Sequence, residues 1–321
     1  MFPFYETMWR YHCQYRKDGM TKTGGKRMLR IGRFEIERVE EVVLREPKAL
    51  FAAWDEARVD PIRDWFVGDY YDPEDGSFAT SIHTWLVRDG DTTILIDTCG
   101  GNHKPRPASP RFDGVDLPFL DRLAEKGVTP ESVGYVLLTH LHVDHVGWNT
   151  RLEDGTWVPT FPNAKYVMTS IERDWRDPER GAKGKSEAPT YPFLDSVKPV
   201  LDNHSNVEIV TGDEEGYLPG IDFMPVPGHA PGMMGIRLRD GGDEALFIAD
   251  VMHQPIQVSN PGWSSKYCEN PDLATETRAR VLAHAAHTGC LILPAHFGGT
   301  HCGYVRRDGD GYTYEPSKVM P

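Results

Sequence analysis

The pattern of hydrophobic and polar positions predicts β-strands along much of the chain. Residues 31–37 alternate apolar with polar positions, which is typical of a strand with one solvent-facing side. Residues 82–88 and 92–97 are two further apolar-rich runs, and the Asp-Gly-Asp sequence at 89–91 between them is a strong hairpin signal. Residues 135–138 form a continuous apolar run, which predicts a strand buried on both faces.

Helical signals follow these strands. Residues 117–126 predict a helix, and Thr129-Pro130 predicts the start of another short one. The clearest late helix begins at Asn270-Pro271 and runs to about residue 288. It carries one stripe of mostly apolar side chains: Leu273, Thr277, Val281 and Ala285.

The second half of the chain repeats the rhythm of strands and helices. Residues 100–118 are rich in proline and glycine and predict a long irregular loop, of a kind that is usually functional or disordered. No short repeat or low-complexity linker is visible, so the pattern predicts one α/β domain of two halves over residues 29–321. Further strands are expected near residues 165–168, 207–210, 221–225, 234–239, 245–249 and 290–293, with a last hairpin at 308–311.

Residues 1–28 form a polar arm with scattered aromatic side chains and no clear periodicity. The arm could pack on the body of the protein or on a second subunit, and both alternatives stay open. A homodimer that exchanges the arm is a hypothesis. Deleting residues 1–28 without changing the size of the protein in solution would contradict it.

Composition and charge narrow the class of protein. The 321 residues are 39% hydrophobic and 26% charged, which is ordinary for a soluble globular protein. No apolar run approaches the roughly 18 residues of a membrane span, and the first twenty residues lack a secretory h-region, so we expect a cytoplasmic protein without a membrane partner. A net charge of −13 disfavours nucleic acid as a partner. Five scattered cysteines without a CxxC motif indicate reduced thiols.

Histidines and aspartates cluster directly after the apolar run 135–138, in the sequence Thr-His-Leu-His-Val-Asp-His-Val-Gly at 139–147. In an extended segment, side chains two residues apart share a face, so His140, His142 and Asp144 can point into one cavity. A helix beginning near Asp144 would place His145 at its N-terminus, where the helix dipole keeps an imidazole neutral. These nitrogen and oxygen donors predict a metal site suited to zinc and tolerant of iron, cobalt or manganese.

Three later residues stand where further metal ligands are expected, each after an apolar run. His229 lies in a Pro-Gly-His-Ala-Pro-Gly turn, Asp250 follows residues 245–249, and His296 follows residues 291–295. Strands that end together can deliver such side chains to one edge of a sheet. The alternative is a set of structural polar residues, but a structural zinc site closes with four ligands, and seven are too many for one.

The motifs His-Leu-His-Val-Asp-His, Pro-Gly-His-Ala-Pro-Gly, Ile-Ala-Asp-Val and Pro-Ala-His-Phe resemble those of the metallo-β-lactamase superfamily over about residues 30–310. Within it, the chain resembles the lactonase and methyl parathion hydrolase-like branch, and chlorothalonil hydrolytic dehalogenases are also similar. The resemblance implies an α/β fold, a four-layer αβ/βα sandwich with two central sheets and helices outside.

The resemblance also implies how the seven ligands divide between two metals, taken as Zn²⁺. The first metal would be held by His140, His142 and His229. The second would be held by Asp144, His145 and His296, with Asp250 bridging the two. Asp97, in the Ile-Asp-Thr sequence at 96–98, matches a recurring element of the family and would support the ligands from beneath.

Two residues are candidates for a direct catalytic role. Two metals about 3.5–4 Å apart would bind a bridging hydroxide by lowering the pKa of water toward about 7, and would polarise the substrate oxygen. Asp144 could orient that hydroxide or shuttle its proton. His253 lies three residues after Asp250, where many lactone-cleaving relatives carry a tyrosine, and residues 253–257 more resemble the branch that cleaves organophosphates and aryl esters. The alternative for His253 is a supporting or surface histidine.

Several aromatic side chains could line a pocket near the metals, although aromatic residues more often pack in a core or at a rim. These are Phe66, Tyr70, Tyr71, Trp148 and Trp263. The cysteines are expected to be small buried hydrophobic residues.

The leading hypothesis is hydrolysis of a small, uncharged ester, either a lactone or an aryl ester, by the bridging hydroxide. The substrate is expected to be hydrophobic or aromatic. The runner-up is hydrolytic dehalogenation or phosphotriester cleavage of an aromatic compound. A hypothesis of another class is a non-catalytic metal-binding scaffold. The nuclease branch of the family fits poorly with the negative charge, and the thiolester-cleaving branch fits poorly with the short C-terminal hairpin.

Overall fold

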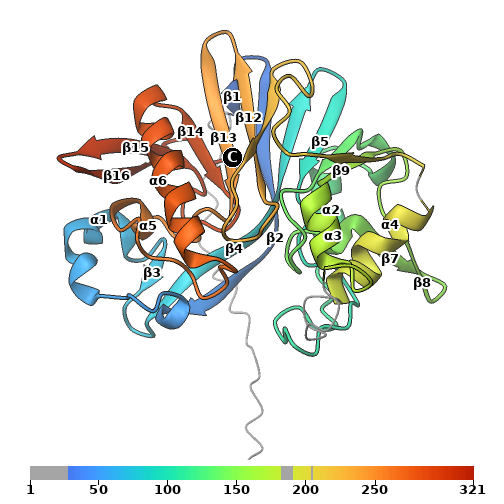
Figure 1. Cartoon of the computed structure of the whole chain (residues 1–321), viewed down its shortest axis with the longest axis horizontal. Helices are drawn as coiled ribbons and strands as arrows, with labels where there is room; N and C mark the ends of the chain where they lie inside the picture. The colour runs from blue at the N-terminus through green and yellow to red at the C-terminus, as the bar shows by residue number, and fades with distance from the viewer. Residues whose placement is uncertain (1–27, 182–190, 204) are drawn as a thin grey trace, which may run out of the picture.

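Two β-sheets lie face to face at the centre of the molecule, which is represented by a computed structural model (Figure 1). The structure describes residues 28–181, 191–203 and 205–321. The predicted arm of residues 1–28 lies outside the described residues except for Met28, so its role stays a prediction.

The first sheet has the strand order β1-β2-β4-β5-β6-β9-β10, with β3 beside β4. Its strands are β1 (Leu29–Ile31), β2 (Phe34–Pro47), β3 (Tyr71–Asp72), β4 (Ser77–Asp89), β5 (Thr92–Ile96), β6 (Tyr135–Leu137), β9 (Lys165–Thr169) and β10 (Val207–Val210). The second sheet has the order β11-β12-β13-β14-β15-β16. Its strands are β11 (Ile221–Pro225), β12 (Met234–Asp240), β13 (Asp243–Ala249), β14 (Leu291–Pro294), β15 (Gly303–Asp308) and β16 (Gly311–Pro316). A separate hairpin is formed by β7 (Thr150–Glu153) and β8 (Thr156–Pro159).

Helices cover the outer face of each sheet, which gives the four-layer αβ/βα sandwich that the resemblance implied (Figure 1). The first sheet is covered by α2 (Phe119–Glu125), α3 (Ser170–Arg176) and α4 (Lys198–Asn203), and the second by α5 (Ile256–Ser259) and α6 (Pro271–Thr288). The shorter elements are α1 (Arg63–Phe66), the π turn η6 (Phe193–Val197) and the 3-10 turns η1 (Lys48–Leu50), η2 (Glu56–Arg58), η3 (Asp60–Ile62), η4 (Pro130–Ser132) and η5 (Gly147–Asn149). No helix in the described part of the chain combines the length and apolar character of a membrane span.

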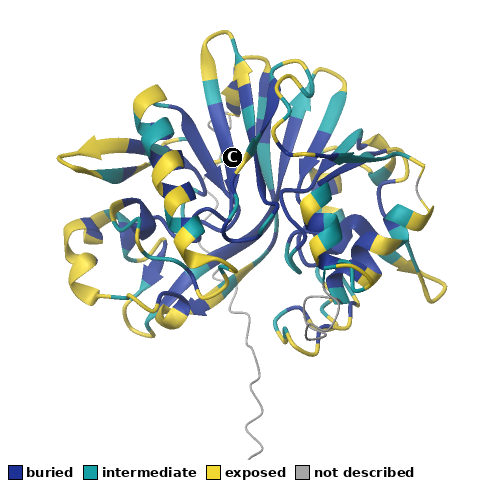
Figure 2. Cartoon of the chain, viewed as in Figure 1, coloured by how far each residue is buried: buried dark blue, intermediate teal, exposed yellow. Residues whose placement is uncertain are grey.

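The apolar core has three layers because successive side chains of a strand point to opposite faces. In β5, Ile94 and Ile96 pack between the two sheets, and Leu95 packs under the helices of the first sheet. In β13, Phe247 packs between the sheets, and Ile248 packs under α6. Figure 2 shows this burial in the two sheets, with exposed residues on the outer faces of the helices.

Most predicted elements are confirmed, and two expectations are wrong. Residues 31–37 are not one strand, because Gly32 (φ 53°) turns the chain and β1 pairs antiparallel with β2. No helix begins near Asp144. The backbone after His145 is bonded to the end of β5 instead: Gly147 N–H donates to Cys99 O (2.7 Å) and Trp148 N–H to Thr98 O (2.8 Å). Those bonds replace the i→i−4 ladder that a helix would need.

Candidate metal centre

Seven side chains from four separate segments meet between the ends of the two sheets. The segment 140–145 follows β6, His229 follows β11, Asp250 follows β13 and His296 follows β14. The structure therefore brings together every ligand predicted from the sequence: His140, His142, Asp144, His145, His229, Asp250 and His296.

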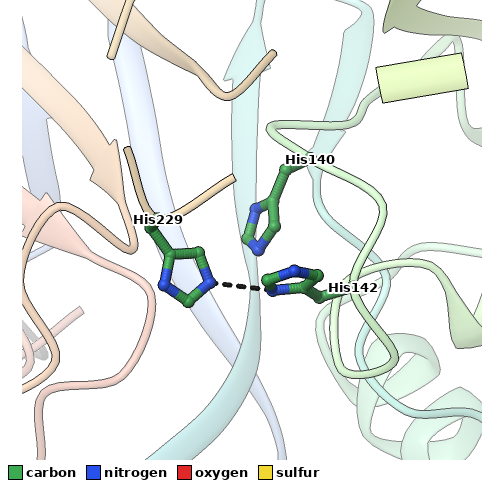
Figure 3. A group of neighbouring side chains, drawn as sticks. All are labelled: His140, His142 and His229. Carbon is green, nitrogen blue, oxygen red and sulfur yellow. Dashed lines mark hydrogen bonds between the residues drawn. The ribbon is translucent and has the colours of Figure 1, made fainter. Parts of the chain in front are cut away.

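The first group comprises His140, His142 and His229, whose rings lie close together and meet edge to face (Figure 3). Each offers one nitrogen to a cluster in which these atoms all lie within 4.8 Å of one another. Nε2 of His229 lies 2.8 Å from Nδ1 of His142, the contact dashed in Figure 3. The ring centroids are 4.5 Å apart for His140 and His142 and 5.0 Å apart for His140 and His229. This spacing suits a cation held by three imidazoles.

The second group comprises Asp144, His145 and His296. Nε2 of His145 lies 3.7 Å from Oδ1 of Asp144, and Nε2 of His296 lies 3.5 Å from Oδ2 of Asp144. Asp250 stands between the two groups, because its Oδ2 is 3.2 Å from Nε2 of His229 and 3.1 Å from Nε2 of His296. A single carboxylate therefore contacts members of both groups.

The donor atoms fit bound cations because several of them have no hydrogen-bond partner. Nε2 of His140, Nε2 of His145 and Oδ1 of Asp250 are buried and accept or donate no hydrogen bond in the described structure. Buried polar atoms are nearly always paired, and leaving one unpaired costs about 1–3 kcal/mol. Ligand atoms of these three residues lie within 4.8 Å of one another, and Nε2 of His145 lies 3.4 Å from Oδ1 of Asp250, so a cation held among them would give each residue a partner.

The nitrogens that face away from the centre are held by other groups, which fixes the orientation of each ring. Nδ1 of His145 lies 2.9 Å from Oδ2 of Asp97, and Nδ1 of His296 lies 3.1 Å from the carbonyl oxygen of Ser81. Nδ1 of His140 lies 3.0 Å from Oγ1 of Thr139. Asp97 thus lies beneath the motif, where the resemblance placed it.

Burial and nearby charges shift the pKa values of these histidines in different directions. Burial lowers the pKa of His140 and of His229 well below its usual value, which keeps both imidazoles neutral. Burial alone would also lower the pKa of His145, but the carboxylates of Asp250 and Asp144 raise it well above the usual value. The predicted helix dipole at His145 is absent, and this residue faces carboxylates instead.

His253 lies in the centre and not on the surface. It is buried, and its ring centroid is 4.9 Å from that of His229 and 5.6 Å from that of His296. Nε2 of His253 lies 3.4 Å from Oδ2 of Asp250. The surface alternative for this residue is therefore wrong.

A cavity of about 530 Å³ opens beside the centre, and Asp144, Asp250 and His253 are among its lining residues. The five aromatic residues suggested from the sequence do not line it. Trp148 stacks on Phe119 in the core of the first half, and the others pack in the core around α6. The cavity wall is instead formed by Phe112, Trp175 and Tyr267 together with aliphatic side chains such as Leu44, Leu50, Ile82, Leu141 and Val143.

The cysteines are largely as expected. Cys99, Cys290 and Cys302 are buried and free, and Cys13 lies outside the described residues. Cys268 is less buried, and its Sγ lies 3.9 Å from Nδ1 of His229. The sequence analysis gave no sign of that contact.

A buried glutamate that the sequence analysis did not single out joins two ligand-bearing loops. The carboxylate of Glu172 in α3 accepts hydrogen bonds from the backbone N–H of Leu141 (3.1 Å) and of Gly232 (2.9 Å). Leu141 stands between two candidate ligands, and Gly232 lies three residues after His229. The one local signal was the Thr169-x-x-Glu172 spacing of a helix cap, and Thr169 does cap α3. That spacing carries no information about distant loops.

A second glutamate, Glu269, was also missed, and it lies against His142. Its Oε1 is 3.4 Å from Nε2 of His142, and its Oε2 accepts a hydrogen bond of 2.8 Å from the indole N–H of Trp175. Burial alone would raise the pKa of Glu269, but its hydrogen bond with His142 and the charge of Arg176 lower it to about 2. Glu269 is therefore a carboxylate at neutral pH.

Comparisons with known proteins agree with this arrangement. The family model described as the metallo-beta-lactamase superfamily matches residues 78–310. The chain is 26% identical over 229 residues to N-acyl homoserine lactonase AiiB of Agrobacterium fabrum, covering 67% of this chain and 79% of that protein. It is 23% identical over 181 residues to the probable metallo-hydrolase YybB of Bacillus subtilis, covering 55% of this chain and 67% of that protein.

Solved structures share the fold over nearly the whole chain. The hydrolase AbOPH, described as a beta lactamase superfamily member, superposes with a TM-score of 0.76 at 26% identity, covering 94% of this chain and 100% of that one. AidC, described as a dizinc quorum-quenching lactonase in complex with a product, superposes with a TM-score of 0.72 at 20% identity, covering 92% of this chain and 98% of that one. At that identity, the second likeness supports the fold alone.

Proposed function

The chain belongs to the metallo-β-lactamase superfamily of hydrolases, with lactonases among its relatives, and from this premise we propose that it is a binuclear metal hydrolase of small uncharged esters. The observation that carries the proposal is the position of Asp250, whose carboxylate contacts both His229 and His296. In the proposal, His140, His142 and His229 hold one cation, Asp144, His145 and His296 hold a second, and Asp250 bridges them. The nitrogen and oxygen donors suit Zn²⁺.

When bound, two such cations supply an activated water and an electrophile for the substrate oxygen. The side chains of this chain then bind, orient and move protons. Asp144 lines the cavity, so its carboxylate can accept a proton from the attacking water and return it to the leaving oxygen. His253 also lines the cavity, where a neutral imidazole can donate a hydrogen bond to an oxygen that gains negative charge.

The lining of the cavity supports an uncharged, apolar substrate. Two cationic side chains reach it among the described residues, and each is already paired with a carboxylate: Arg111 with Glu46, and Arg176 with Glu269. A substrate carboxylate would therefore have to compete with a carboxylate of the protein. Aromatic and aliphatic walls favour an acyl chain or a ring instead. The relationship to the lactonase AiiB supports a lactone as the ester.

The direct test of the reaction is a substrate panel with the Zn²⁺-loaded protein. We expect turnover of acyl-homoserine lactones or of an aryl lactone such as dihydrocoumarin. Paraoxon and a polychlorinated nitrile arene test the second candidate, phosphotriester cleavage or hydrolytic dehalogenation, which the histidine at position 253 favours. Release of chloride or of nitrophenol from these compounds, with the lactones untouched, would replace the ester hypothesis by the second one.

Two variants separate a catalyst from a metal-binding scaffold. In His142→Ala or Asp250→Ala, the rate should fall by a factor of about 100 or more because a group that acts at the reacting centre is lost. Circular dichroism and gel filtration check that each variant is folded. If the wild type turns over these substrates no faster than the two variants do, the protein is a non-catalytic metal-binding scaffold.

A further inference from the structure

We propose that Glu269, Arg176 and Glu172 form a positioning relay for one half of the metal centre, the half that comprises His140, His142 and His229. The inference rests on the proposed function, because it assigns a role only if those imidazoles hold a cation. The relay runs from the segment just before α6, through the last residue of α3, to the buried side of α3.

The first step of the relay fixes the tautomer of His142. Nδ1 of His142 points to His229 and the centre, so a cation bound there leaves the ring proton on Nε2. Nε2 lies 3.4 Å from Oε1 of Glu269 and 2.7 Å from Nη2 of Arg176. A guanidinium only donates, so the 2.7 Å contact with Arg176 requires an Nε2 without a proton. When a cation takes Nδ1 and the proton moves to Nε2, that contact must lengthen, and Glu269 is the carboxylate acceptor beside the ring. The carboxylate of Glu269 is thus the acceptor that the metal-binding tautomer requires.

The same glutamate also holds the loop that bears His229. The backbone N–H of Glu269 donates to the carbonyl oxygen of His229 (3.0 Å). The indole N–H of Trp175 and the guanidinium of Arg176 both donate to the Glu269 carboxylate, so this side chain is held from α3. Glu269 therefore joins the orientation of one imidazole to the position of another.

Arg176 extends the relay to Glu172, which holds the backbone of both ligand loops. Nε of Arg176 lies 3.5 Å from Oε2 of Glu172, and Glu172 accepts the N–H groups of Leu141 and Gly232. The approach is close: a Cβ at position 232 would lie 2.7 Å from Cβ of Ile171 and 2.8 Å from the backbone N of Glu172. Both loops are thereby fixed to the start of α3.

The other half of the centre has separate supports. His145 is held by Asp97, and His296 by the carbonyl oxygen of Ser81, and both groups come from strands of the first sheet or their ends. Within the described residues, the hydrogen bonds of the relay do not reach either of these two histidines. Loss of the relay should therefore weaken one cation site more than the other.

The test is competitive metal release from the loaded protein. Glu269→Ala, loaded with two equivalents of Zn²⁺, is titrated with a chelator, and we expect one equivalent to leave about 10–100-fold more readily than from the wild type. The second equivalent should change much less. Glu269→Gln should recover part of the loss, because its amide oxygen can still accept the Nε2 proton. Glu276→Gln, at an exposed glutamate of α6, is the matched control and should release both equivalents as the wild type does.

Cobalt substitution shows which site is weakened. In the NMR spectrum of Glu269→Ala with one equivalent of Co²⁺, paramagnetically shifted N–H signals should come from two imidazoles, those of His145 and His296. Occupation of the other site would give such signals from three imidazoles, those of His140, His142 and His229. Unchanged release, or equal weakening of both equivalents, would overturn the relay. A wild-type protein that binds fewer than two equivalents would instead overturn the proposed binuclear function, so the two failures are distinguishable.

Discussion

Asp97 and His145 are joined by a contact of 2.9 Å between Oδ2 and Nδ1, and this pair links the end of β5 to the segment after β6. Asp97 also accepts hydrogen bonds of 2.8 Å from the backbone N–H and from the hydroxyl of Thr139. Its backbone is left-handed, with φ 59°. A non-glycine residue in that conformation is strained, and the three hydrogen bonds explain how the strain is held.

We predict that Asp97→Asn weakens the second cation site and lowers stability. The asparagine keeps one oxygen for three donors, so at least one buried hydrogen bond is lost, at a cost of about 1–3 kcal/mol each. An NH₂ group in the place of Oδ2 would face His145. Metal release should show the reverse of the Glu269 pattern, with the site of Asp144, His145 and His296 weakened about 10–100-fold. Chelator competition and urea denaturation measure the two effects.

The matched control for this prediction is Asp91→Asn, at an exposed position in the turn between β4 and β5. It should leave both metal release and the urea midpoint close to those of the wild type. Normal metal release from Asp97→Asn would show that the ring of His145 is held in another way.

Removal of the metal should lower the thermal stability of the whole protein. The two groups bring histidines and aspartates from four segments together. Each cation that binds only the folded state therefore stabilises it by about 4 kcal/mol when free metal is at 1,000 times Kd. Thermal unfolding with and without a chelator measures this shift, and added Zn²⁺ should reverse it. An identical unfolding temperature in both conditions would argue against tight binding of cations by the folded chain.

Gly147 is predicted to be intolerant of a side chain. A Cβ at this position would lie 1.9 Å from the carbonyl carbon and oxygen of Gly100, so the two backbone segments would have to separate. We expect Gly147→Ala to cost about 1–3 kcal/mol in the free energy of unfolding, as overpacking does. It should also reduce activity, because Gly147 lies two residues after His145.

Urea denaturation of Gly147→Ala and Gly262→Ala compares a crowded glycine with an open one. An added Cβ at position 262 meets no atom within 4 Å, so that variant should unfold at the same urea concentration as the wild type, or slightly above it. Equal midpoints for the two variants would mean that the contact between residues 100 and 147 is loose.

The candidate ligands could be picked out from the sequence because ligand chemistry restricts both residue type and spacing. His140, His142 and Asp144 stand two residues apart directly after the apolar run that forms β6, and Asp250 and His296 follow apolar runs that are strands. Apolar runs and turn signals also predicted β5 and β13, in which successive side chains pack in different core layers. These signals are local, and a single sequence contains them.

Apart from Asp97, the supports of the site could not be predicted because they depend on long-range contacts. Glu172 and Glu269 bond with residues far away in the sequence, and no local pattern marks them. The cavity aromatics Trp175 and Tyr267 were missed for the same reason. No helix begins near Asp144, because the backbone after His145 forms hydrogen bonds with the residues after β5. The local sequence does not reveal that pairing.

A buried lysine in the long loop should make stability depend on pH. Lys104 is fully buried, and its ammonium donates to Oγ1 of Thr150 (2.8 Å), with Oδ1 of Asp195 3.8 Å away. Burial lowers the pKa of Lys104 from its usual 10.5 to about 7, although Asp195 opposes this shift. The unfolded chain therefore binds more protons than the folded one between about pH 7 and about pH 10.5. Stability supplied by this residue should rise with pH across that window.

Lys104→Met removes this group while keeping an unbranched apolar side chain. The difference in unfolding free energy between wild type and variant should shift in favour of the wild type as pH rises from about 7 to about 10, by up to about 1.4 kcal/mol per pH unit. Urea denaturation at several pH values measures it, with Lys318→Met at an exposed lysine as the control. A difference that stays constant with pH would mean that Lys104 keeps its charge in the folded protein. Its ion pair with Asp195 would then outweigh the cost of burying it.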